Sequence, residues 1–234
     1  MAGMGLDALA EKARPVALAG ERLLPVLAPL APLLPDGALR RGSVISVAGS
    51  TSLALALLAG ASAAGSWCAA VGLASLGVVA AAEVGIALER FPLVAAPPSP
   101  EEWAWAVAAL MDAVDVVLAR PAGLVREAVA RRLAAKARER SAVLVAVGSW
   151  PGADVRLAVT GAAWEGIGQG DGRLGARRVD VVANGRGAAA REKRVALWLP
   201  GPDGGASAAS GGSGLRKDAE MRACAGQDAM AGAG

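Results

Sequence analysis

The sequence predicts an α/β fold with a mostly parallel central sheet, helices flanking it, and an antiparallel hairpin extension at the C-terminal end. Between residues 43 and 147, short apolar runs alternate with longer segments of helical periodicity. Such alternation is typical of strand–helix–strand units and a parallel sheet. Beyond residue 154 the helical segments stop, and strand-like runs are joined by glycine-rich turns, which favours antiparallel pairing.

The first three strands are expected at 43–48, 67–72 and 92–95, with helices between them at 51–59 and 76–88. The run Val-Ile-Ser-Val in the first strand is apolar enough to be buried on both faces. The first helix begins directly where this strand ends, and Gly60 and Gly65 are expected to close it.

The best-marked helix begins after Ser99, with Pro100 at its first position and Glu102 at its third, which together form a capping box. A basic amphipathic helix is expected at 125–140, where apolar residues recur at every fourth position. The remaining strands are expected at 114–119, 142–147, 154–164, 177–183 and 194–199.

The composition divides the chain into three parts. Residues 1–33 are expected to hold a short N-terminal helix at 6–14 and a proline-rich lead-in, because the prolines exclude a longer helix. Residues 34–200 have the length of one domain. Residues 201–234 are rich in Gly, Ala and Ser and are expected to form a disordered tail.

The composition also excludes several chemistries. The 234 residues include no histidine, which removes a Ser-His-Asp triad and imidazole metal ligands. Cys68 lies in an apolar run and Cys224 in the polar tail, so we expect no structural disulfide and a reduced, cytoplasmic location. The uncharged stretch between Arg41 and Glu83 is interrupted by small polar residues, and charges near the N-terminus break up any secretory signal. Neither a membrane span nor a signal is therefore expected.

The segment Gly49-Ser50-Thr51-Ser52 stands between a strand and a helix, which is the layout of a phosphate-binding loop. That chemistry needs helix N-terminal amides, a lysine for the phosphates and a hydroxyl for Mg²⁺. The lysine is missing, and an exposed helix end alone stabilises an anion by only roughly 0.3–1 kcal/mol. A tight strand-to-helix turn capped by a hydroxyl is the favoured interpretation, with residual nucleotide binding as the alternative. We expect no cofactor and no metal.

Several stretches resemble the RecA family. Residues 34–45, Leu-Pro-Asp-Gly-Ala-Leu-Arg-Arg-Gly-Ser-Val-Ile, are similar to the family's lead-in to its phosphate loop. Residues 67–71 and 80–94 are similar to its next strand, helix and strand, and 113–118, Ala-Val-Asp-Val-Val-Leu, to its metal-associated strand. The resemblance covers about residues 34–200 and implies a RecA-like core.

The positions that carry the family's ATPase chemistry differ in this chain. Gly49-Ser50-Thr51-Ser52-Leu53 resembles Gly-Lys-Thr-Thr-Leu with Ser50 in place of the lysine. The resemblance also places Leu73 where the family has its catalytic glutamate, and Arg120 where it has its metal-associated aspartate. Leucine cannot activate water, and an arginine repels Mg²⁺. Three losses together imply that the protein is not an enzyme.

Among RecA-like proteins without this machinery, the chain resembles the ImuA-type proteins of actinobacteria, chiefly through residues 49–58 and 65–69. That resemblance implies a non-catalytic accessory subunit of a damage-inducible translesion synthesis complex. Its partners would be an ImuB-type inactive Y-family polymerase homologue and, indirectly, an error-prone DnaE-type polymerase. A RecA- or KaiC-type ATPase and a SulA-like cell-division inhibitor are the alternatives.

Basic residues and one tryptophan are candidate contacts for DNA or a protein partner. Three cations share one face of the helix at 125–140, although Glu127 and Glu139 would neutralise part of it. The arginines of the hairpin region could equally protect an edge strand. Trp105 falls off the apolar face of its helix and is expected to be exposed, whereas the other tryptophans after residue 100 are expected in the core. The candidates are Arg132, Lys136, Arg140, Arg177, Arg178, Arg186 and Trp105.

Overall fold

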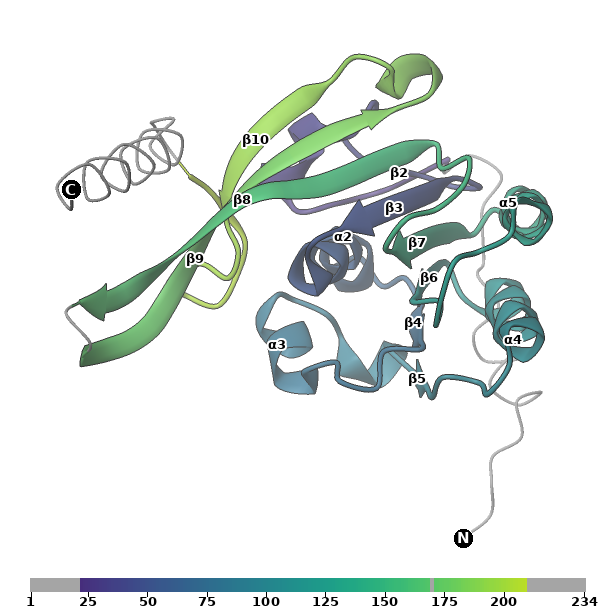
Figure 1. The fold of residues 1–234 in the computed structure, drawn as a ribbon, viewed down its shortest axis with the longest axis horizontal. Helices are drawn as coiled ribbons and strands as arrows, with labels where there is room; N and C mark the ends of the chain where they lie inside the picture. Colours follow the sequence, from purple (N-terminus) through teal and green to yellow (C-terminus); the bar gives the residue numbers. More distant parts are fainter. Residues whose placement is uncertain (1–21, 169–170, 210–234) are drawn as a thin grey trace, which may run out of the picture.

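A nine-stranded sheet forms the centre of the computed structural model, which describes residues 22–168 and 171–209 (Figure 1). The strand order is β11-β10-β9-β8-β3-β7-β6-β4-β5. All neighbours from β8 to β5 run parallel, and β8 to β11 pair antiparallel. The predicted α/β class, with its mostly parallel sheet and antiparallel C-terminal strands, is confirmed. The strands are β3 (Val44–Ala48), β4 (Cys68–Val71), β5 (Leu93–Val94), β6 (Val116–Ala119), β7 (Val143–Val147), β8 (Val155–Gly168), β9 (Asp171–Gly185), β10 (Lys193–Trp198) and β11 (Ser207–Ala208).

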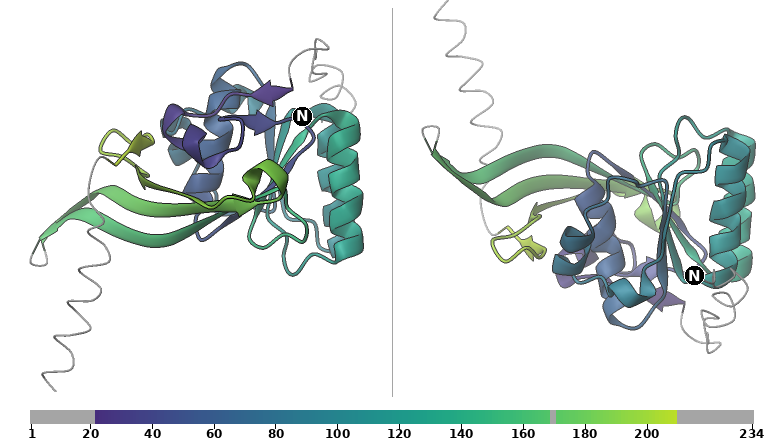
Figure 2. Two further views of the ribbon diagram at one scale, coloured as in Figure 1. Left: turned by 90° about the horizontal axis from the view of Figure 1, so that it is seen from above. Right: turned by 90° about the horizontal axis from the view of Figure 1, so that it is seen from below.

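Helices cover the two faces of the sheet and enclose two hydrophobic cores (Figure 2). Helices α2 (Thr51–Ala63) and α3 (Val78–Glu83) pack on one face, and α4 (Pro100–Ala113) and α5 (Glu127–Arg140) pack on the other. Ser99 caps α4 as predicted, because its hydroxyl accepts a hydrogen bond of 3.2 Å from the backbone N–H of Glu102.

The segment at 22–33 belongs to the folded domain, although the sequence placed the domain boundary at residue 34. Strand β1 (Leu23–Leu24) pairs with β2 (Leu39–Arg40), and the 3₁₀ helix Ala28–Leu33 follows it. Leu24, Leu30 and Leu33 are buried in the same core as α2. We call residues 22–33 the N-terminal strap, because they cover the side of α2 that faces away from the sheet.

Helix α2 continues beyond Gly60, where the sequence predicted its end. A Cβ atom on Gly60 would lie 2.5 Å from the Cα of Val26, so the glycine allows the strap to lie against the helix. The helix ends before Gly65, the second glycine that was expected to close it, whose φ of +97° is left-handed. Its N–H donates to the carbonyl of Ser62, and that of Ser66 to the carbonyl of Ala61, as in a Schellman cap.

Helix α3 is much shorter than the predicted 76–88. Gly85, with a φ of +104°, ends it, and the N–H of Ile86 donates to the carbonyl of Ala81. The same Schellman geometry therefore stops α3 one turn before the 3₁₀ helix Leu88–Arg90.

The C-terminal strands are longer than predicted. Strands β8 and β9 extend to Gly168 and from Asp171, so most of the expected turn at 166–172 is strand. Strand β11 pairs with β10, so the tail does not begin at residue 201 as predicted. The expected helix at 6–14, the tail from residue 210 and Cys224 lie outside the described residues.

No helix in the described part of the chain is long and apolar enough to cross a membrane.

Candidate functional site

The turn between β3 and α2 is closed by its own side chains. Ser50 has extended backbone angles, and its Oγ accepts a hydrogen bond of 3.1 Å from the N–H of Leu53. Gly49 has a φ of +82°, and a Cβ atom there would lie 3.4 Å from the carbonyl oxygen of Val159. The favoured interpretation of this segment as a tight turn with a hydroxyl cap agrees with this geometry.

Arg120 reaches the start of α2 from the end of β6. One guanidinium nitrogen donates to the Oγ1 of Thr51 over 2.5 Å, across the strand β7 that separates β6 from β3. The side chain is half-buried, and it places a positive charge beside the positive end of the helix dipole. A second cation such as Mg²⁺ is therefore strongly disfavoured at Thr51.

Other groups needed for nucleotide chemistry lie elsewhere. Leu73 is 7% exposed and packs in the core. Both lysines of the described segments are engaged away from the turn: Lys136 pairs with Asp112 at 2.8 Å, and Lys193 donates to the carbonyl of Leu34 at 2.7 Å. Among the residues that the structure describes, no group of three or more Asp, Glu, Cys or His side chains could hold a metal ion.

The basic face of α5 is partly neutralised by the neighbouring helix. Lys136 and Arg140 both form ion pairs with Asp112 of α4, at 2.8 and 2.6 Å, whereas Arg132 is exposed. Sequence reasoning missed Asp112 because it lies on a different helix. Two of the three predicted phosphate contacts on this face therefore hold the two helices together.

The hairpin of β8 and β9 carries two of the candidate arginines and projects beyond the rest of the molecule (Figures 1 and 2). The Arg177 guanidinium lies 5.8 Å from the ring centroid of Trp164, and Arg178 is half-buried. Trp164 was expected in the core but is 50% exposed, on the part of β8 that lies beyond its pairing with β3. Leu174 is also exposed, so the hairpin presents apolar surface.

The remaining tryptophans behave mostly as predicted. Trp105 is 67% exposed. Trp103 and Trp150 are buried, and their ring centroids lie 6.3 Å apart. Trp198 is half-buried on β10.

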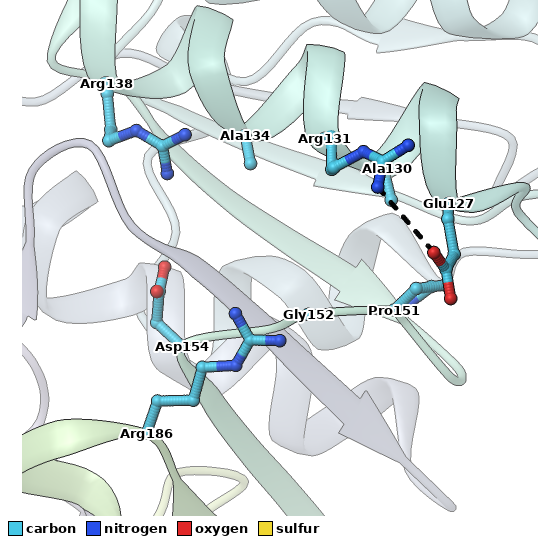
Figure 3. A pocket seen from close by; sticks show the side chains of 9 residues that line it. All are labelled: Glu127, Ala130, Arg131, Ala134, Arg138, Pro151, Gly152, Asp154 and Arg186. Atoms are coloured by element: carbon cyan, nitrogen blue, oxygen red, sulfur yellow. Dashed lines mark ion pairs between the residues drawn. The ribbon is translucent and has the colours of Figure 1, made fainter.

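Arg186, at the end of β9, lines a cleft at the amino ends of β3 and β8 (Figure 3). Two adjoining hollows of 280 and 500 Å³ share Arg138, Asp154 and Arg186, and we call them together the arginine cleft. Sequence reasoning did not single out Arg138 or Asp154, because the cleft joins α5, the start of β8 and the end of β9. No local motif signals such a meeting of three distant segments.

Comparison with known proteins identifies the family to which the chain belongs. The model of the MT3502 N-terminal domain matches residues 32–152, just over half of the chain. The chain belongs to this family. The matched MT3502 domain contains both ends of the Arg120–Thr51 contact and stops before β8 begins. A relative, the uncharacterized protein Rv3395c of Mycobacterium tuberculosis, is 33% identical over 195 residues, which cover 78% of this chain and 93% of the relative.

Proposed function

We propose that the protein is a RecA-like, non-catalytic accessory subunit of a damage-inducible translesion synthesis complex in the cytoplasm, and that it acts by holding other proteins together. The observation that carries this proposal is the hydrogen bond between Arg120 and Thr51.

The Arg120–Thr51 contact supports two parts of the proposal, the RecA-like core and the absence of catalysis. The RecA resemblance assigns Arg120 to the metal-associated position and Thr51 to the Mg²⁺-binding hydroxyl, so it requires the two to be neighbours in space. They are neighbours, although 69 residues separate them in the sequence. Because an arginine fills the position, the site lacks the carboxylate that would hold Mg²⁺ and the free hydroxyl that would assist it.

The surface that would hold a partner is the projecting hairpin. Trp164 and Leu174 are exposed large apolar side chains on neighbouring strands, and aromatic anchors of this kind dominate many protein interfaces. Trp105 is a second exposed anchor on α4. The partner we propose is the ImuB-type inactive polymerase homologue, through which the error-prone DnaE-type polymerase would be reached.

Thermal unfolding with millimolar MgATP tests the non-catalytic part of the proposal. If the protein bound MgATP, a nucleotide concentration of 100 times the dissociation constant would stabilise the fold by about 2.7 kcal/mol and raise Tm by several degrees. We expect no rise in Tm and no phosphate release. Turnover of ATP, or a rise in Tm that an Arg120→Asp variant increases, would favour the RecA- or KaiC-type ATPase.

Titration with the purified ImuB-type protein tests the scaffolding part. We expect micromolar or tighter binding, which a Trp164→Ala/Leu174→Ser double variant weakens about tenfold or more, because interface anchors carry most of the binding energy. The matched control is Leu124→Ser, which removes a 96% exposed leucine outside the hairpin. If the wild type does not bind at micromolar concentration, the proposal fails, and binding to the division tubulin homologue instead would favour the SulA-like alternative.

A further inference from the structure

The arginine cleft lies at the edge of the sheet opposite to Arg120. Neither Arg120 nor the turn at residues 49–52 lines it. Its two hollows share Arg138, Asp154 and Arg186, and the guanidinium of Arg186 lies toward Gly152 (Figure 3). Arg138 comes from the last turns of α5, and Arg186 follows the last residue of β9. The cleft therefore brings together two guanidinium groups from opposite sides.

Some arginines of the described residues are paired with a carboxylate, and these two are not. Arg41 is paired with Asp115 at 2.7 Å, and Arg140 with Asp112 at 2.6 Å. Within the part of the chain that the structure describes, no carboxylate lies within 4.0 Å of the guanidinium nitrogens of Arg138 or Arg186. Both remain free to donate to a ligand.

The charge of the lining leaves an excess of cations. In the smaller hollow three arginines face Glu127 and Asp154, and Glu127 already lies 3.8 Å from Arg131. Asp154 is held in the sheet, because its Oδ2 accepts a hydrogen bond of 2.8 Å from the N–H of Val44. The larger hollow adds Arg40, Arg41 and Asp36, and Arg41 is already paired with Asp115, so the two hollows together still carry more cations than carboxylates. An anion would meet a net positive field along the cleft.

Two glycines let the elements that carry the arginines come close. A Cβ atom on Gly152 would lie 3.2 Å from the Nη2 of Arg186, so this guanidinium rests on the turn before β8. A Cβ atom on Gly42 would lie 3.1 Å from the Cα of Arg138, so α5 packs directly on the turn before β3. Both glycines have left-handed φ values, of +72° and +80°, which disfavour other residues. The backbone contact at Gly42 thus fixes where Arg138 begins, and the turn at Gly152 supports the guanidinium of Arg186.

We propose that the arginine cleft binds the phosphodiester backbone of single-stranded nucleic acid. Guanidinium groups match phosphate oxygens with two parallel hydrogen bonds, and a tetrahedral phosphate can accept from Arg138 and Arg186 in different planes. Two joined hollows leave space for successive phosphates. No aromatic side chain lines either hollow, so the contact reads the backbone and not the bases.

Fluorescence anisotropy with a short labelled oligothymidylate tests this site on the full chain. We expect micromolar binding at low salt that weakens as salt rises. An Arg138→Gln/Arg186→Gln variant should bind about tenfold more weakly, and the slope of log K against log salt should fall in magnitude by about 1.4, because two phosphate contacts to a single strand are lost. Both residues are exposed, so the variant should keep the Tm of the wild type.

The matched control is Arg132→Gln, which removes the same charge from an exposed position of α5 outside the cleft. It should keep most of the affinity. Equal loss with Arg132→Gln, or unchanged binding by the double variant, would overturn the proposal. So would displacement of the oligonucleotide by inorganic phosphate at equal phosphate concentration, or tighter binding of a polyglutamate peptide of the same charge. The proposal does not depend on the accessory function, since a protein that fails to bind the ImuB-type partner can still be tested here.

Discussion

The arginines at the two edges of the sheet differ in the contacts that they make within the protein. At the carboxyl edge, one guanidinium nitrogen of Arg120 donates to Thr51, and the positive charge of this side chain disfavours a metal ion at the turn. At the amino edge, Arg138 and Arg186 have no carboxylate close enough to neutralise them among the described residues. The edge at which many α/β proteins bind ligands therefore disfavours a metal ion, and the opposite edge carries two arginines without a paired carboxylate.

At the residue scale, Cys68 should be unreactive while the protein is folded. Burial, reinforced by the charge of Asp115, raises the pKa of its thiol from 9.0 to about 12. In a Cys224→Ser variant, a thiol reagent at a pH of about 8 should label Cys68 only after denaturant is added, because the thiolate is the reactive species. Rapid labelling of the native variant would contradict the burial.

The same raised pKa gives a direction to the pH dependence. The unfolded thiol ionises as pH passes 9.0, while the folded thiol stays protonated until about 12. The stabilising contribution of this residue is therefore complete below pH 9.0 and is lost as pH rises toward 12. A Cys68→Ala variant should show a smaller loss of stability over this range.

At the element scale, the sequence predicted best where local chemistry decides the structure. The capping box at Ser99 and the buried run at 44–47 are such cases. Gly60 is not, because its role depends on the strap, which is distant in the sequence. The Gly85 cap was a local signal that the prediction overlooked.

The candidate site also has features that could be predicted from the sequence and features that could not. The strand–turn–helix layout around Ser50 could be predicted, because it follows from successive residues along the chain. The arginine cleft and the Asp112 pairs could not be found, since they depend on which helix packs against which strand.

Replacement of Gly60 by alanine should destabilise the protein, although alanine usually stabilises a helix by up to about 1 kcal/mol relative to glycine. The new methyl group would overlap the backbone of Val26, and we expect a loss of roughly 1–3 kcal/mol in denaturant unfolding. Gly123→Ala is the control, because nothing lies within 4 Å of its Cβ position. Equal stability of both variants would mean that the strap does not pack on α2.

Replacement of Ser141 by glycine should stabilise the protein. Ser141 ends α5 with a φ of 54°, and a left-handed conformation costs a non-glycine residue roughly 1–2 kcal/mol. Glycine loses more entropy on folding, so we expect a net gain of about 0.5–1 kcal/mol. Chemical denaturation measures it, with Ser141→Ala as the control that keeps the strain. A glycine variant no more stable than the alanine variant would refute the prediction.

At the scale of the whole molecule, the hairpin has a rigid base and a less supported end. Near its base, β8 pairs with β3 and β9 pairs with β10 as far as Arg178. The backbone of Arg177 still bonds to Leu199 and Pro200. Closer to the hairpin end, the described residues of the two strands pair with each other alone, and register shifts interrupt the ladder after Val159 and after Glu165. Bulges of this kind bend and twist a hairpin.

Hydrogen exchange should separate these two regions. A two-stranded ladder is marginally stable by itself, so amides at 165–168 and 171–176 should exchange much faster than those of β7. Adding the protein partner should slow exchange at the hairpin end and leave β7 unchanged. Equal protection of the hairpin and β7 in the free protein would contradict this view of the hairpin.

The N-terminal strap also limits how far the protein can be shortened from its N-terminal side. A shortened version that starts at residue 34 keeps the segment most similar to RecA but loses Leu24, Leu30 and Leu33. Their removal would leave the outer side of α2 bare, and α2 is apolar around its whole circumference. Such a truncated protein would be prone to aggregation and would need to recruit a chaperone or a neighbouring chain to cover the gap.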